Sequence, residues 1–83
     1  MKVRIKLYAS LAEYLPDGAV KNEADIDVAD TTSPTQIIHR LGLPEKMCHM
    51  VLINGVYIAP DDRNTAKLEE GDHLAIWPPV AGG

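Results

Sequence analysis

The chain has 83 residues, of which 46% are hydrophobic and 24% are charged, so it has the size of one small domain. Its apolar runs are only a few residues long, and residues 1–10 lack the apolar stretch of a signal peptide, so we expect a cytoplasmic protein that does not enter a membrane. The formal charge of −4 argues against nucleic acid as a partner, because phosphate binding needs a cationic face.

Two segments near the start show the alternation of half-buried strands. Residues 2–8 alternate between apolar side chains and basic or aromatic ones, which is a period of two. The alternation resumes over residues 20–28, where the polar side chains are acidic. If the two strands pair, Arg4 and Lys6 lie near these acids on one exposed face. Cross-strand charge pairing then explains the basic stripe, and partner binding is the alternative that stays open.

Two helical segments are predicted from their starts. Ser10 followed by Glu13 has the spacing of a capping box and indicates a short helical turn between the two strands. Ser33 begins the clearest helix: it can act as the N-cap, the proline after it suits the first helical position, and Gln36 can reach back to the cap. Gly42 ends this helix. We therefore expect one main helix with a single apolar face.

A hairpin follows the helix. Asn54-Gly55 lies between the apolar runs at residues 50–53 and 56–58, and these two residue types supply the positive φ angles that a type I′ turn needs. Residues 61–67 are polar, so we expect a surface loop there.

The last predicted strand covers residues 73–77 and alternates so that Trp77 faces away from the core. Pro78 and Pro79 end it, because proline cannot donate to a sheet ladder. The element order of two strands, helix, hairpin and strand indicates an α+β domain. The β-grasp (ubiquitin-like) arrangement fits best, a mixed sheet with one main helix packed on one face. Its first and last strands are parallel central neighbours, which puts Tyr8 beside Trp77.

Few side chains suggest catalysis or metal binding. His39, His49 and His73 are scattered, and Cys48-His49 supplies only two of the four ligands that zinc takes, so we expect no metal site. A lone Cys48 is best interpreted as a small buried hydrophobic residue. There is no glycine-rich phosphate loop, and we expect no bound cofactor.

The most distinctive segment is the ending Pro78-Pro79-Val80-Ala81-Gly82-Gly83. Glycines lack Cβ, so their backbone fits a channel too narrow for side chains and can present the Gly83 carboxylate to a reactant. The prolines stiffen the exit from the sheet. A carboxylate is a poor acyl donor, so its chemistry needs activation, most simply as an acyl-adenylate that a separate enzyme makes from ATP. We therefore expect one domain over residues 1–83 with a flexible Gly-Gly tail at 78–83; the alternative is a frayed chain end.

A family resemblance is carried by this ending and by three further runs, Tyr8-Ala9-Ser10-Leu11-Ala12, Val51-Leu52-Ile53-Asn54-Gly55 and Gly71-Asp72 before a short apolar strand. Together they resemble the small subunit of molybdopterin synthase, the MoaD branch of the ubiquitin-like sulfur carriers that also includes ThiS. The resemblance implies that Gly83 is adenylated by a MoeB-like adenylyltransferase and converted to a thiocarboxylate. It implies that Gly82 and Gly83 enter a MoaE-like large subunit, where the sulfur passes to a pterin precursor. The chain is then a carrier without catalytic activity of its own.

The resemblance also implies contacts with the large subunit from the sheet face beside the tail, at Tyr8, Trp77, Pro78, Pro79, Val80 and Ala81. Many members carry two aromatic residues before the prolines, whereas this chain has Ile76-Trp77. Other products stay open: a tungsten-pterin pathway, or thiazole synthesis with a ThiS-like carrier. Outside sulfur transfer, the alternatives are a protein modifier joined to lysines through Gly83 and a binding module with an inert tail.

Overall fold

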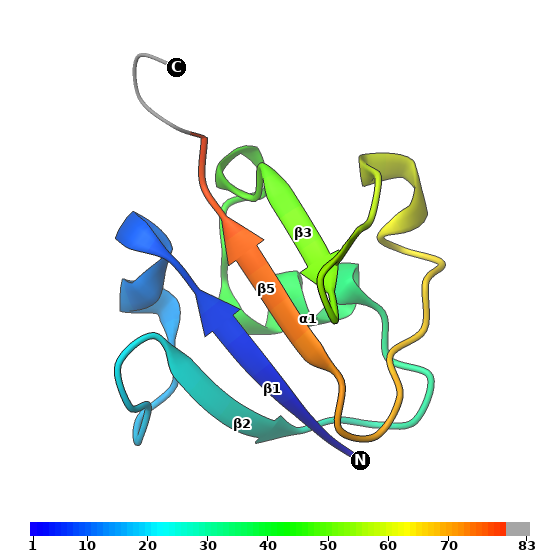
Figure 1. Ribbon diagram of the computed structural model, residues 1–83, viewed down its shortest axis with the longest axis horizontal. Helices are drawn as coiled ribbons and strands as arrows, with labels where there is room; N and C mark the ends of the chain where they lie inside the picture. Colours follow the sequence, from blue (N-terminus) through cyan, green and yellow to red (C-terminus); the bar gives the residue numbers. More distant parts are fainter. Residues whose placement is uncertain (80–83) are drawn as a thin grey trace.

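The computed structural model describes residues 1–79. Within these residues, five strands form one mixed sheet in the order β2-β1-β5-β3-β4, and the helix α1 packs against one face of it (Figure 1). The strands are β1 (Lys2–Leu7), β2 (Glu23–Asp27), β3 (Met50–Ile53), β4 (Val56–Tyr57) and β5 (His73–Trp77). The helical segments are α1 (Pro34–Leu41) and the short 3₁₀ turns η1 (Ala9–Tyr14), η2 (Glu45–Met47) and η3 (Pro60–Asp62).

The strand pairing confirms the predicted α+β, β-grasp architecture. β1 and β5 are parallel neighbours, with Lys6 opposite Ala75 and Leu7 opposite Ile76. The other pairs, β1 with β2, β3 with β4 and β3 with β5, are antiparallel. A parallel pair needs a long crossover connection, and the segment containing α1 and the β3–β4 hairpin supplies it.

The helix α1 has the predicted start and end. The Ser33 side chain accepts a hydrogen bond from the Gln36 N–H, and the Gln36 side chain accepts one from the Ser33 N–H, at 3.3 and 2.8 Å. Gly42 ends the helix with a left-handed φ of 74°, which costs glycine little because it has no Cβ. No helix in the described part of the chain is long and apolar enough to cross a membrane.

The core lies between the sheet and α1. It is built from the inward side chains of the alternating strands and the apolar face of α1, as the alternation predicts. Fully buried aliphatic side chains each stabilise the fold by about 1.5–3 kcal/mol. The buried core residues are Val3, Ile5, Leu7, Leu11, Ile26, Ile37, Ile38, Leu43, Cys48, Val51, Leu68, Leu74 and Ile76.

The second strand is shorter than the alternation over residues 20–28 predicts. Val20 is 72% exposed and exchanges backbone hydrogen bonds with Glu23, at 3.0 and 3.2 Å. Lys21 between them has a positive φ of 58°. The chain reverses at this point, so Val20 belongs to a tight turn and the strand begins only at Glu23.

The first helical segment is also shifted from its prediction. The turn η1 starts at Ala9 with Tyr8 in the cap position, and no side chain caps it. Ser10 lies inside the turn instead of before it, so the predicted capping box with Glu13 does not form. The local pattern found the helical turn but placed its start two residues late.

The sequence predicts a surface loop at residues 61–67. The prediction is wrong for Arg63, whose side chain is buried at 8% exposure. Its guanidinium donates hydrogen bonds to main-chain carbonyl oxygens. A guanidinium has five N–H donors in a fixed plane, so it can be buried when carbonyls surround it. The neighbouring residues in the sequence are all polar or small, and they give no sign of this burial.

Candidate functional site

Two aromatic rings meet at the end of the sheet where β5 leads to Pro78. Tyr8 and Trp77 stack with ring centroids 3.8 Å apart and planes 4° from parallel. The Tyr8 N–H donates to the Ile76 carbonyl oxygen at 3.2 Å, which holds the end of β1 beside β5. Trp77 remains 42% exposed. The prediction that these two side chains share the exposed face is confirmed.

The stacked pair belongs to a larger apolar surface, which we call the aromatic patch. Met50 lies opposite Trp77 in the β3–β5 pairing, and Leu52 lies opposite both Ala75 and Tyr57. Met50 is 40% exposed and Tyr57 is 51% exposed. The aromatic patch consists of Tyr8, Met50, Leu52, Tyr57 and Trp77. A contiguous exposed apolar surface on a small domain is typical of an interaction site.

Three members of the aromatic patch, Met50, Leu52 and Tyr57, were not predicted as site residues from the sequence. The alternation in β3, which turns Val51 into the core, is the signal that finds Met50 and Leu52 on the outer face. Tyr57 follows only from the hairpin register, which pairs it with Leu52. The aromatic patch therefore depends on knowing which strands are neighbours.

The rest of the outer face carries charged residues, which we call the charged half: Lys2, Arg4, Glu23, Asp25 and Asp27. Arg4 contacts Asp25 at 2.8 Å and Glu23 at 3.6 Å, and Lys2 lies 3.4 Å from Asp27. The hydrogen bond from Arg4 holds the pKa of Asp25 below its ordinary value of 3.8 and raises the pKa of Arg4. The predicted cross-strand charge pairing is confirmed.

The end of β5 is fixed on both sides before the predicted tail. The His49 N–H donates to the Trp77 carbonyl oxygen at 3.0 Å. Pro78 is buried and Pro79 is exposed. Pro78 therefore packs against the domain. Proline has no N–H and so cannot continue the hydrogen bonds of the sheet, but its apolar ring can still be buried.

The chemistry predicted from the sequence lies further along the chain than the described residues. Val80, Ala81, Gly82 and Gly83 all fall outside residues 1–79. Of the predicted site residues, the structure brings together Tyr8 and Trp77, and Pro78 and Pro79 follow Trp77 in the chain.

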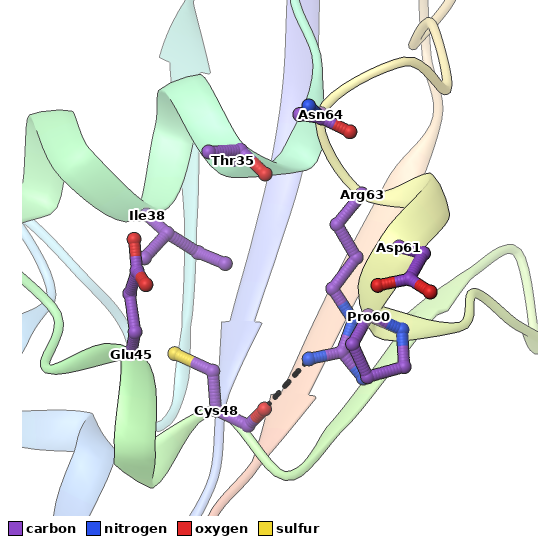
Figure 2. A pocket seen from close by; sticks show the side chains of 8 residues that line it. All are labelled: Thr35, Ile38, Glu45, Cys48, Pro60, Asp61, Arg63 and Asn64. Atoms are coloured by element: carbon purple, nitrogen blue, oxygen red, sulfur yellow. Dashed lines mark hydrogen bonds between the residues drawn. The ribbon is translucent and has the colours of Figure 1, made fainter.

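An open pocket of about 370 Å³ lies between α1 and η3, away from the aromatic patch (Figure 2). Cys48 lies at its floor and is 4% exposed. Its thiol donates to the Pro44 carbonyl oxygen at 3.5 Å, and burial raises the pKa of the Cys48 thiol. The thiol is therefore protonated at neutral pH and is a poor nucleophile, which agrees with its interpretation as a core residue. Among residues 1–79, no three His, Cys, Asp or Glu side chains gather to hold a metal ion.

Comparison with known proteins gives a family and several structures of the same fold. A family model described as "ThiS family" matches residues 5–83. The comparison with curated proteins gives no match. The crystal structure of SAMP1 from Haloferax volcanii is similar at 25% identity and a TM-score of 0.69, with 100% of both chains covered.

Two further structures share the fold. The first is a putative molybdopterin converting factor subunit 1 from Pyrococcus furiosus, with 20% identity, a TM-score of 0.66, and 95% of this chain and 98% of that chain covered. The second is the complex of subunits 1 and 2 of the molybdopterin-converting factor from Helicobacter pylori 26695. It has 18% identity, a TM-score of 0.61 and 100% of both chains covered.

Proposed function

The chain belongs to the ThiS family of small sulfur carriers, and on that premise we propose that it carries sulfur for molybdopterin synthesis. The observation that carries the proposal is the aromatic patch at the exit of β5. It lies where the chain leads into the Gly-Gly ending, which the family match includes. The likeness to molybdopterin converting factor subunit 1 over almost the whole chain supports the choice of pathway.

The proposed chemistry takes place at the Gly83 carboxylate. A carboxylate oxygen attacks the α-phosphate of ATP on a MoeB-like adenylyltransferase, which forms the acyl-adenylate and releases pyrophosphate. A sulfur nucleophile supplied by a donor then displaces AMP and leaves a thiocarboxylate. Gly82 and Gly83 contribute by their lack of side chains, which lets the backbone enter a narrow channel. The chain itself holds no cofactor in this scheme, and ATP belongs to the activating enzyme.

Inside a MoaE-like large subunit, the thiocarboxylate sulfur then displaces an oxygen substituent from the pterin precursor and forms a thioester. Water hydrolyses the acyl–sulfur bond, so the sulfur stays on the pterin and Gly83 regains its carboxylate. The structure from Helicobacter pylori is a complex of subunits 1 and 2 of the molybdopterin-converting factor. We assign this chain the place of subunit 1. The aromatic patch around Tyr8 and Trp77 docks on the large subunit, while Pro79, Val80 and Ala81 lead the tail inward. The chain is thus a non-catalytic subunit. Because activation consumes ATP, the cytoplasm is the proposed place of action.

The experiment incubates the protein with its activating enzyme, ATP and a sulfur donor, and then measures the mass of the fragment that ends at Gly83. A fragment is needed because oxidation of any of the three methionines adds nearly the same mass as replacing oxygen by sulfur. The expected result is sulfur on Gly83. An unmodified Gly83, when the same enzyme loads a known carrier, contradicts the proposal.

Variants of the ending separate the tail from the fold. Gly82→Leu, or one residue added after Gly83, should abolish sulfur delivery and leave the urea unfolding midpoint unchanged. Val20→Leu is the matched control, because it adds bulk at an exposed position away from the aromatic patch. Pterin synthesis at the wild-type rate with either tail variant contradicts the carrier mechanism. A loaded Gly83 that delivers no sulfur to the pterin precursor points instead to a thiazole-type carrier, and bonds to lysines of other proteins point to a modifier.

A further inference from the structure

Arg63 is a buried cation whose three guanidinium nitrogens all bind main-chain carbonyls. Nε donates to the Ile58 oxygen at 2.9 Å, Nη1 to the Cys48 oxygen at 2.8 Å and Nη2 to the His49 oxygen at 3.1 Å. Figure 2 shows the side chain reaching from the end of η3 to Cys48, with that hydrogen bond dashed. One side chain therefore joins the segment after β4 to the segment just before β3.

The carbonyls that Arg63 binds are one hydrogen bond away from the end of β5. His49 accepts from Arg63 through its oxygen and donates through its N–H to the Trp77 oxygen at 3.0 Å. Trp77 carries the last carbonyl before Pro78. We call Trp77 and Pro78 the tail root. Two hydrogen bonds in series thus connect the guanidinium to the tail root, and the three carbonyls that Arg63 binds directly belong to Cys48, His49 and Ile58.

Arg63 also reaches the far side of the aromatic patch. Its guanidinium carbon lies 5.8 Å from the centroid of the Tyr57 ring, within the range of a cation–π contact. Tyr57 and Trp77 stand on strands separated by β3 in the sheet. The same side chain therefore influences both the Tyr57 edge of the patch and, through His49, its Trp77 edge.

The charge of Arg63 has no carboxylate partner among the ion pairs of residues 1–79. Burying a cation is costly unless its hydrogen bonds are satisfied. Here the carbonyls satisfy them, and an apolar side chain of similar size would fill the same space but leave the three carbonyl oxygens without these donors. What an apolar side chain lacks is the fixed plane of donors that sets the positions of three carbonyls at once.

We propose that Arg63 is a positioning residue for sulfur delivery: it sets the direction in which the tail leaves the sheet. The inference rests on the proposed function. The Gly83 sulfur has to reach a reacting atom in a partner, and misplacement by about 1 Å can slow such a reaction by about 100-fold. A rotation at Trp77 or Pro78 changes the position and direction from which the chain continues toward Gly83. Through its hydrogen bond to His49, Arg63 restricts that rotation.

The test compares Arg63→Lys and Arg63→Met with a control variant that lowers the stability of the fold at a site away from the tail root. Lysine keeps the charge but cannot donate to three carbonyls in one plane. Leu68→Val is the control: Leu68 is buried, and its N–H bonds to Thr32 on the helix side of the molecule. Urea unfolding midpoints show whether the losses match. Trp77 is the only tryptophan, so its fluorescence reports on the tail root directly.

Both Arg63 variants should change the Trp77 emission and slow sulfur delivery to the large subunit by about tenfold or more in kcat/KM. Leu68→Val should leave the emission and the delivery rate as in the wild type. The proposal is overturned if the Arg63 variants match Leu68→Val in both readouts. If the wild type is never loaded with sulfur, the proposed function fails, while the emission of Trp77 still decides whether Arg63 positions the tail root.

Hydrogen exchange in the wild-type protein covers the case in which the Arg63 variants do not fold. The Arg63 Nε–H and the His49 amide should then exchange through one common opening, with the same dependence on denaturant. Exchange of the Arg63 Nε–H in a separate, more frequent opening that leaves the His49 amide protected contradicts the proposal. This measurement needs no partner and no sulfur chemistry.

Discussion

The outer face of the sheet has two unlike halves built on the same strand alternation. In the charged half, Arg4 binds Asp25 and Glu23, so the charges satisfy one another within the chain. In the aromatic patch, Tyr8 and Trp77 stack but remain open to solvent beside Met50. Paired charges gain little from a partner that would have to desolvate them, whereas apolar surface gains from burial. The difference indicates that the charged half stabilises the fold, and it supports the proposal that the aromatic patch binds a partner.

Lys6 lies at the border between the two halves. It pairs in register with Glu23 on β2 and with Ala75 on β5. The strand β1 thus contributes Arg4 to the charged half, and Tyr8, the residue that follows β1, belongs to the aromatic patch. The outward residues of β1 alternate regularly along the whole strand, so β1 does not itself separate the two halves. The neighbouring strands do: β2 supplies the acidic residues on one side, and β5 supplies Trp77 on the other.

Trp77→Ala should produce the largest effect. If the aromatic patch is the docking surface, the substitution removes its central anchor and should weaken binding to the large subunit by about 2 kcal/mol, measured by calorimetry. Val20→Ala is the control, because Val20 is an exposed apolar residue outside the patch, and it should bind like the wild type. An affinity of Trp77→Ala equal to that of wild type removes the patch from the interface.

Tyr8→Leu should have a smaller effect on the same binding. Leucine keeps an apolar side chain at this position but loses the stacking on Trp77, which is worth about 1 kcal/mol for aromatic pairs. The expected result is a loss of affinity of that size with a changed Trp77 fluorescence. Unchanged emission in Tyr8→Leu would show that the stacking does not hold Trp77 in place.

Asp25→Asn and Arg4→Met, with the double variant, test the charged half. Exposed ion pairs contribute little, so the affinity for the large subunit should stay at the wild-type value and the urea midpoint should fall slightly. The double-mutant cycle isolates the pair itself. A loss of affinity as large as that of Trp77→Ala would show that the charged half also binds the large subunit, which contradicts the proposed difference between the two halves.

The smallest expected effect is the pH dependence of Asp25. Its folded pKa lies below 3.8 because Arg4 donates to it, so the unfolded chain takes up the proton first as the pH falls. The stabilisation is therefore complete above the unfolded pKa and is lost as the pH falls through the folded pKa. Urea midpoints of the wild type and Asp25→Asn should converge in that range. A difference that persists at the lowest pH contradicts this assignment.

Much of the fold was predictable because its signals are local. Ser33 and Gln36 form the cap that their spacing predicts, and Asn54 and Gly55 both take the positive φ of the hairpin turn. The alternation in β5 correctly turned Trp77 outward. The predicted start of the second strand was wrong. The chain reverses at Lys21, which leaves Val20 outside the strand, and an alternating pattern does not reveal such a reversal.

The sequence by itself determined most of the strands, the main helix and the buried faces of β1, α1 and β5, because caps, turns and period-two alternation act over a few residues. Only the tertiary structure decided which strands are neighbours, and that brought Met50 and Tyr57 to Trp77. It also buried Arg63 and Pro78, whose environments are made by segments distant in the chain. The physical reason is that burial and pairing depend on contacts between remote residues, which no pattern within one segment contains.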